Sequence, residues 1–347
     1  MQDIAMPKSA ITRRAAWIAK DMLRLPQRWL THLSVTEVQE LECAAQGVIQ
    51  SGITLREVCQ QNFELPTLGL KLLKLSDTLM NGIGFEVIRG LPVAQYSQKM
   101  AAIIFCGIGC YIGGARSQNA EGDLLGHVRN TGASSQDINS RIYQTAERQT
   151  FHTDSADVVG LLCLKTAKIG GKSLLVSTES IFNKMQAERP DLLALLFEPI
   201  ATDRRGETPV GEKPYFEIPV FNWYQGKLTG MYQRQYIDSA QRFASAKRLT
   251  PLHVEALDYF DALANDPQLH IAMQLQAGDI QFVYNHALLH DREAFTDWPE
   301  QENRRHLLRL WLSLENDRPL PKCFTQRYGS VEIGNRGGIV ISHGEDL

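Results

Sequence analysis

The segment Phe151-His152-Thr153-Asp154 carries the strongest structural signal in this chain. Residues two apart on an extended strand point to the same face, so His152 and Asp154 can offer an imidazole and a carboxylate to one metal ion. The apolar run at 158–164 follows at once and is short enough for a buried strand. Alone, a His-x-Asp tripeptide is more often a surface pair or a buried histidine with its hydrogen bonds satisfied.

A third possible ligand, His290, ends the segment at 284–290, which reads Tyr-Asn-His-Ala-Leu-Leu-His. Two histidines and one carboxylate on one face of an octahedron leave positions open for substrate and oxygen, as in iron(II) oxygenases. The sequence therefore predicts a non-haem iron(II) centre made of His152, Asp154 and His290. His286, four residues before His290, is expected to pack beside this centre.

Three further segments surround these candidates in sequence order. Gly170-Gly171-Lys172-Ser173 precedes the apolar strand predicted at 174–176, and a turn at 278–279 enters a strand that leads toward His290. The segment 304–312, Arg-Arg-His-Leu-Leu-Arg-Leu-Trp-Leu, is expected to be a strand. Its alternation places Arg305 and Arg309 on one face.

These motifs, in this order, resemble the taurine dioxygenase-like (TauD/TfdA) family of iron(II)/2-oxoglutarate-dependent oxygenases, over about residues 82–321. The resemblance implies that the two histidines and the aspartate bind iron. It also implies that the Ser173 hydroxyl and Arg305 hold the far carboxylate of 2-oxoglutarate. Arg309 matches a second family arginine, which serves either the cosubstrate or an anionic substrate. Arg304 remains a competitor of Arg305, because the spacing from His290 is slightly longer than is usual in the family.

The resemblance further implies a dioxygenase that hydroxylates an unactivated C–H bond of a small molecule. The cosubstrates would be O2 and 2-oxoglutarate, which is converted to succinate and CO2. Desaturation or ring formation at the same centre stays open, because these outcomes use the same ligands. A metal-dependent hydrolase and a ligand-binding barrel are the alternatives of another class. The hydrolase would not explain Ser173 and Arg305, and the intact ligand triad argues against a non-catalytic barrel.

The expected fold is α+β with a mainly β core: a double-stranded β-helix, or jelly roll, with flanking helices, as the resemblance implies. Ser34 and Glu37 form a capping-box pattern before the apolar helical spacing of residues 38–48. The remaining helices are predicted at 66–80, 97–110, 180–188 and 251–264, and further strands at 85–88, 125–130 and 269–275.

Composition sets limits on the protein class. The chain has 347 residues, of which 44% are hydrophobic and 22% charged, which is typical of a globular protein. A net charge of −3 gives no general attraction to nucleic acid or to an anionic membrane. No apolar run approaches the length of about 20 residues that spans a bilayer. Six scattered cysteines fit thiols in a reducing compartment, so we expect a cytoplasmic protein.

We expect one oxygenase domain over residues 31–347, with a jelly-roll core at about 82–321. Residues 1–30 are basic and are expected to form a packed helix or an arm, with a transit peptide as the alternative. Homo-oligomerisation stays open.

Several other residues are weaker candidates. Tyr143 and Gln144 are expected to border the cosubstrate, and Asp157 and Arg292 to be local salt-bridge partners. Residues that could face the substrate or shape an anion pocket, but are as easily solvated, are His127, Arg129, Arg204, Arg205, Arg234 and Tyr236.

Overall fold

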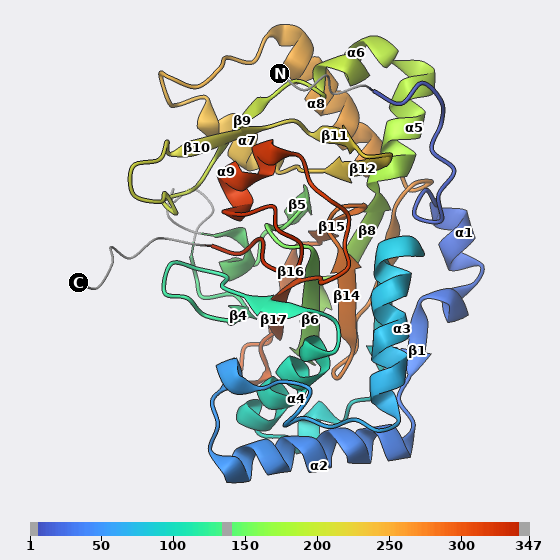
Figure 1. The fold of residues 1–347 in the computed structure, drawn as a ribbon, viewed down its shortest axis with the longest axis vertical. Coiled ribbons are helices and arrows are strands. Elements are labelled where there is room, and N and C mark those ends of the chain that lie inside the picture. Colours follow the sequence, from blue (N-terminus) through green and yellow to red (C-terminus); the bar gives the residue numbers. More distant parts are fainter. Residues whose placement is uncertain (1–5, 134–140, 340–347) are drawn as a thin grey trace.

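The computed structural model describes residues 6–133 and 141–339, and two β-sheets form its centre (Figure 1). The larger sheet has the strand order β1-β2-β14-β6-β17-β3, with β4 also paired to β17. Its strands are β1 (Leu30–His32), β2 (Phe85–Arg89), β3 (Gly114–Arg116), β4 (Leu125–Val128), β6 (Val158–Lys165), β14 (Ile280–Tyr284) and β17 (His306–Ser313). All its pairings are antiparallel except β1 with β2.

The smaller sheet is antiparallel and has the order β13-β8-β15-β5. It consists of β5 (Gln149–His152), β8 (Ser173–Ser177), β13 (Ile271–Met273) and β15 (Leu288–Arg292). Three two-stranded ribbons are made by β7 (Ile169–Gly170) with β16 (Phe295–Thr296), β9 (Ile200–Asp203) with β10 (Tyr215–Ile218), and β11 (Phe221–Tyr224) with β12 (Lys227–Gly230).

Helices flank the sheets at both ends of the molecule (Figure 1). The helices α2 (Val35–Ser51), α3 (Leu68–Asn81) and α4 (Gln98–Cys110) share one hydrophobic core with the larger sheet. A second core lies under α5 (Thr178–Glu188), α6 (Pro190–Leu195) and α8 (Pro251–Ala264). The short helices are α1 (Ala19–Leu23), α7 (Arg234–Ala240) and α9 (Thr325–Tyr328).

Most predicted elements are present, with shifted ends. The Ser34 hydroxyl accepts a hydrogen bond from the Glu37 amide and begins α2, as the capping pattern predicts. The predicted strand at 304–312 begins only at His306, because residues 301–303 form a 3-10 turn. The strand predicted at 269–275 shortens to Ile271–Met273.

The fold is therefore mixed α and β, with two mainly antiparallel sheets and flanking helices, as expected. Among the described residues, no strand pairing joins the larger sheet to the smaller one. The basic N-terminal segment is packed from residue 6 onward: Trp17 is buried, and its indole Nε1 donates to the Ile83 carbonyl at 2.9 Å. No helix in 6–133 or 141–339 combines the length and apolar character needed to cross a membrane.

The register of the smaller sheet positions the predicted site. His290 on β15 lies opposite His152 on β5. On its other side, β15 pairs with β8 so that Arg292 lies opposite Ser173. His290 and Arg292 are two residues apart on one strand, so their side chains share a face. Residues far apart in sequence are thus brought to one side of the smaller sheet.

Candidate metal centre and its cavities

The three predicted iron ligands converge. His152 ends β5, His290 is central in β15, and Asp154 follows β5 by two residues. The Nε2 atoms of His152 and His290 lie 3.8 and 3.7 Å from the two Asp154 carboxylate oxygens, and the imidazole centroids are 4.2 Å apart. One donor atom from each residue lies within 4.8 Å of the others. Two imidazoles and one carboxylate around one point fit a divalent metal ion.

The imidazole of His152 is oriented for metal binding. Its Nδ1 lies 2.8 Å from the Thr150 carbonyl, which assigns the proton to Nδ1 and leaves a lone pair on Nε2. That lone pair accepts from the Gln149 side-chain amide at 2.9 Å. Burial lowers the pKa of His152, and it lowers the pKa of His290 to about 3. Both rings are therefore neutral at physiological pH, as metal ligation requires.

Asp154 is held as an ionised carboxylate. Burial alone would raise its pKa, but the Arg309 guanidinium, the two histidines and the Trp311 indole together outweigh burial, and the pKa falls to about 2. The Trp311 indole Nε1 donates to Asp154 Oδ2 at 2.8 Å, and Arg309 Nη1 lies 3.4 Å from the same oxygen. The Asp154 amide donates to Asn285 Oδ1 at 3.1 Å. Protein groups therefore hold both the side chain and the backbone of Asp154.

Two buried arginines lie in the same cavity as the metal ligands, close to Ser173. Nη1 of Arg305 and both Nε and Nη1 of Arg292 are buried without a hydrogen-bond acceptor in the described part of the chain. Burial lowers the pKa of Arg305 to about 10, and burial together with the Arg305 charge lowers that of Arg292 to about 9. Both guanidinium groups pack over the Phe295 ring. This part of the cavity is suited to an anion.

Arg309 lies between this cavity and a second one that Asp154 also lines. Its guanidinium carbon is 4.7 Å from the ring centroids of both Tyr143 and Trp311. Its Nε donates to Gln118 Oε1 at 2.7 Å. Tyr143 therefore borders the site as predicted, but its neighbour Gln144 lines neither cavity.

The structure distinguishes Arg305 from Arg304. Arg305 is 6% exposed and lines the metal cavity, whereas Arg304 is exposed and its Nη2 donates to the Pro299 carbonyl at 3.4 Å. Arg292, expected to be a salt-bridge partner, instead donates to the Glu147 carbonyl and faces the cavity.

The remaining weak candidates separate into two groups. His127 and Arg129 are exposed, and His127 packs against His306 instead of the site. Arg204 pairs with Glu212, and Arg234 pairs with three aspartates. Tyr236 does line the second cavity, and Arg205 packs over its ring.

Sequence reasoning missed several residues of the site. Trp311 was within reach of it, because Trp311 stands two residues after Arg309 on the same strand and so shares its face. Gln149, three residues before His152, had no distinguishing signal. The second cavity is also lined by Arg141, Glu207 and Arg327. Arg141 and Glu207 lie outside regular elements, and the four-residue helix α9, which contains Arg327, is too short for periodicity to mark it.

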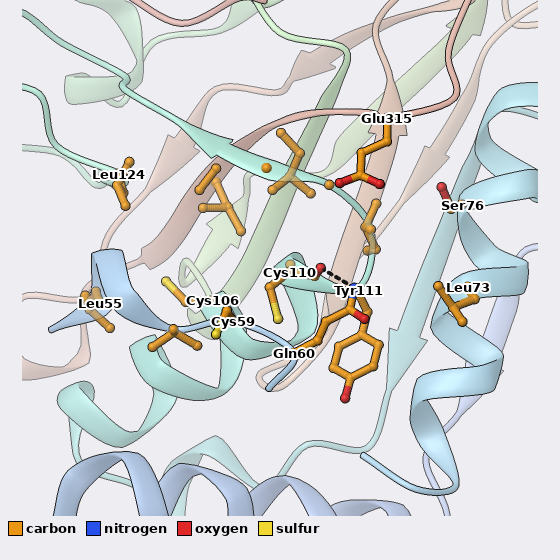
Figure 2. Close-up of a pocket in the computed structure, with 18 of the residues that line it drawn as sticks. Leu55, Cys59, Gln60, Leu73, Ser76, Cys106, Cys110, Tyr111, Leu124 and Glu315 are labelled. Carbon is orange, nitrogen blue, oxygen red and sulfur yellow. Dashed lines mark hydrogen bonds between the residues drawn. The ribbon is translucent and has the colours of Figure 1, made fainter. Parts of the chain in front are cut away.

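A hollow of about 810 Å³ is lined by none of the metal ligands. Figure 2 shows some of the residues that line it. The hollow is lined by α3, α4 and the loop before α3, and Cys59, Cys106 and Cys110 contribute thiols. Burial raises the pKa of Cys106 and of Cys110 to about 12, so these two thiols are protonated and poorly nucleophilic at neutral pH. This hollow therefore offers no thiolate at Cys106 or Cys110.

Comparisons with known proteins agree with this geometry. The chain is 30% identical over 329 residues to "FR-33289 synthase" of Streptomyces rubellomurinus, covering 93% of this chain and 96% of that protein. It is 31% identical to "Taurine hydroxylase-like protein SAT17" of Stachybotrys chartarum, over 85% of this chain and 77% of that protein. Its fold matches a crystal structure of asparagine oxygenase with a TM-score of 0.66 at 15% identity, over 82% of this chain and 93% of that chain.

A family model, described as "Taurine catabolism dioxygenase TauD, TfdA family", matches residues 51–311, which is well over half of the sequence. The predicted resemblance is thereby confirmed. The chain belongs to the taurine catabolism dioxygenase TauD, TfdA family.

Proposed function

We propose that this protein hydroxylates an unactivated C–H bond of a small molecule, with 2-oxoglutarate and O2 as cosubstrates and iron(II) as its metal. The observation that supports this most is a single cavity that holds three convergent metal donors and two buried arginines with unused N–H groups. The asparagine oxygenase with the same fold was crystallised with Fe(II), a hydroxyasparagine and succinate. We further infer that the two sheets correspond to the two halves of a jelly roll.

His152, Asp154 and His290 are assigned as the iron ligands. When bound there with 2-oxoglutarate, iron(II) supplies oxygen activation, and 2-oxoglutarate is converted to succinate and CO2. The protein keeps both imidazoles neutral and the carboxylate ionised before metal arrives. Trp311 and Asn285 hold Asp154 from two sides, so the ligand set is preorganised.

The distal carboxylate of 2-oxoglutarate is assigned to Arg305, Arg292 and Ser173. A guanidinium offers a planar pair of donors that matches a carboxylate. Arg292 Nε and Nη1 and Arg305 Nη1 are the donors that lack acceptors, and a bound carboxylate would satisfy them. The Ser173 hydroxyl now donates to Gln281 Oε1 at 2.8 Å and can turn to the cosubstrate. Arg292 was not expected here from the sequence.

Anaerobic reconstitution tests the proposal. The purified protein is loaded with iron(II) and titrated with 2-oxoglutarate in the absence of O2, and the visible charge-transfer absorption of an iron–keto acid chelate is recorded. O2 is then admitted and succinate is measured across a library of small molecules. Absence of the absorption band, or equal succinate release from Asp154→Ala, would refute the assignment. A hydroxylated product confirms the reaction type, whereas an alkene or ring would replace hydroxylation by desaturation or cyclisation.

A further inference from the structure

A second cluster of arginines lines the cavity on the other side of Asp154. Arg141 precedes the 3-10 turn Ile142–Gln144, Glu207 follows β9, and Arg327 belongs to α9. Gln149, next to the His152 lone pair, lines the same cavity. These side chains therefore border the space immediately beside the metal ligands. Arg327 also lies outside residues 51–311, the part matched by the family model.

The cluster is polar, largely buried and only partly neutralised. The side chains of Arg141, Glu207 and Arg327 are 16, 14 and 9% exposed. Glu207 forms ion pairs with both arginines, directly with Arg141 and at 3.6 Å from Arg327 Nη2. Arg327 Nε donates to the Ser155 hydroxyl at 2.6 Å, and Arg141 Nη1 donates to the Tyr236 hydroxyl at 3.2 Å.

The charges that line this cavity do not balance. Three guanidinium groups line this cavity, from Arg141, Arg309 and Arg327, against the two carboxylates of Asp154 and Glu207. Asp154 is assigned to the metal, whose own charge is positive, so the cavity holds an excess of positive charge. Buried charge that is not neutralised is unfavourable, and a bound oxyanion would relieve it. Arginine is the side chain best suited to recognise one.

We propose that this cavity binds an oxyanion head group of the primary substrate, a carboxylate or a phosphorus or sulfur oxyanion, through Arg327, Arg141 and the Tyr236 hydroxyl. The cavity measures about 40 Å³, room for about three waters at roughly 10–15 Å³ each, which suits a head group. The rest of the substrate then extends past Asp154 and Gln149 toward the metal. The inference rests on the proposed oxygenase function and names its substrate class.

The test uses anaerobic protein loaded with iron(II) and 2-oxoglutarate. Small carboxylates, phosphonates, phosphate monoesters and sulfonates are titrated beside their neutral amides or methyl esters, and binding is read from the shift of the absorption band. The expected result is that acids of at least one type bind and that their neutral partners bind at least about tenfold more weakly. The class that binds distinguishes the planar carboxylate from the tetrahedral oxyanions.

Replacing two residues of opposite charge, Arg327 and Glu207, distinguishes a role of the cluster in binding from a structural role. Arg327→Gln should weaken acid binding about tenfold or more, by losing one charge-assisted partner, whereas Arg327→Lys should restore part of it. Glu207→Gln removes the competing carboxylate and should strengthen acid binding. The controls Arg189→Gln and Glu255→Gln change the two partners of an ion pair outside this cavity, whose side chains are 37% and 49% exposed, and they should leave binding unchanged.

A purely structural ion-pair network would weaken binding of acids and neutral compounds alike in both variants, and that outcome would overturn the inference. Equal binding of acids and their neutral partners by the wild-type protein, or no binding of any acid, would overturn it as well. Failure of the absorption band to form before any probe is added contradicts the oxygenase function instead, so the two failures are distinguishable.

Discussion

Two buried clusters of histidine and aspartate take residues from the same two neighbourhoods of the sequence, but different groups surround them. One is the metal centre of His152, Asp154 and His290; the other is Asp157, His286 and Asp317. Each could hold a metal ion by residue type and distance alone. Comparing them shows what distinguishes a metal site from a structural ion cluster.

In the second cluster the acceptors are already used. Arg336 pairs at 2.7 Å with both Asp157 and Asp317, and His286 Nε2 lies 2.8 Å from Asp157. The other Asp157 oxygen accepts from the Ser313 hydroxyl and the Leu314 amide. A buried arginine thus occupies the place of a cation, and its charge is balanced by aspartates.

In the metal centre the three ligands do not bond to one another; their protein partners are the Gln149 amide at His152 Nε2 and the Trp311 indole at Asp154 Oδ2. The imidazole Nε2 atoms lie 3.7–3.8 Å from the Asp154 oxygens, too far for hydrogen bonds. Arg309 approaches Asp154 only at 3.4 Å. The metal centre is therefore distinguished by ligand atoms that converge without forming hydrogen bonds to one another. Burial and residue type do not distinguish it, because both clusters share them.

The largest effect is expected when the aspartate of the metal centre is replaced. Asp154→Ala should abolish iron binding and reduce succinate formation by about three orders of magnitude or more, since substitution of groups outside the first ligand sphere already costs about 10–100-fold. Iron per folded protein and succinate release measure this. Wild-type turnover in this variant would remove Asp154 from the ligand set.

The reverse experiment targets the structural cluster. Arg336→Met leaves two buried aspartates without their cation and should lower the free energy of unfolding by about 3–5 kcal/mol. Urea denaturation measures this loss. The folded fraction should still bind one equivalent of iron; loss of iron without loss of stability would mean that the two clusters are not separate in role.

The predicted cosubstrate arginine can be tested against its neighbour in sequence. Arg305→Ala should raise the dissociation constant for 2-oxoglutarate by about 10–100-fold, because a charge-assisted pair of about 1.5–3 kcal/mol is lost. The anaerobic absorption titration gives this constant. Arg304→Ala is the matched control and should change nothing; a larger effect of Arg304 would shift the assignment by one residue.

A smaller effect is expected at Arg292, with opposite signs on binding and stability. Arg292→Gln removes one of two buried guanidinium groups, so 2-oxoglutarate should bind about tenfold more weakly, a change of about 1.4 kcal/mol. The protein without cosubstrate should become more stable, because a buried charge without a carboxylate partner is gone. Binding titration and urea denaturation test the two signs separately; unchanged 2-oxoglutarate affinity would return Arg292 to a structural role.

A further prediction concerns pH. The pKa of His290 is lowered to about 3 by burial, so between that value and the ordinary pKa of 6.5 the unfolded chain binds more protons than the folded one. Metal-free protein should therefore lose stability as pH falls below about 6.5, by at most about 1.4 kcal/mol per pH unit from this group. His290→Gln should reduce that slope in urea denaturation at pH 7 and pH 5. An unchanged slope would mean that other buried groups dominate.

The sequence predicted the parts that follow local patterns. The spacing of His152 and Asp154, and that of Arg305 and Arg309, predicted correctly that they share one cavity, although Asp154 follows β5 and Arg305 precedes β17. The Ser34 capping pattern located α2 correctly. Arg292 was misjudged because charged residues near ligands usually find a local partner; only the pairing of β15 with β8 shows that it faces Ser173. Arg141, Glu207 and Arg327 meet through tertiary packing of three loops or short helices, for which the sequence has no periodicity.

Asn285 connects the two pieces of chain that bear the metal ligands. Its side chain contacts the backbone on both sides of Ser155, accepting from the Asp154 amide and donating to the Ala156 carbonyl. Asn285 directly follows β14 and stands five residues before His290, so the two pieces of chain that bear the ligands are fastened to each other by protein alone. These contacts should keep the two pieces of chain aligned when a chelator removes the iron, so iron that is added back should restore the site without refolding.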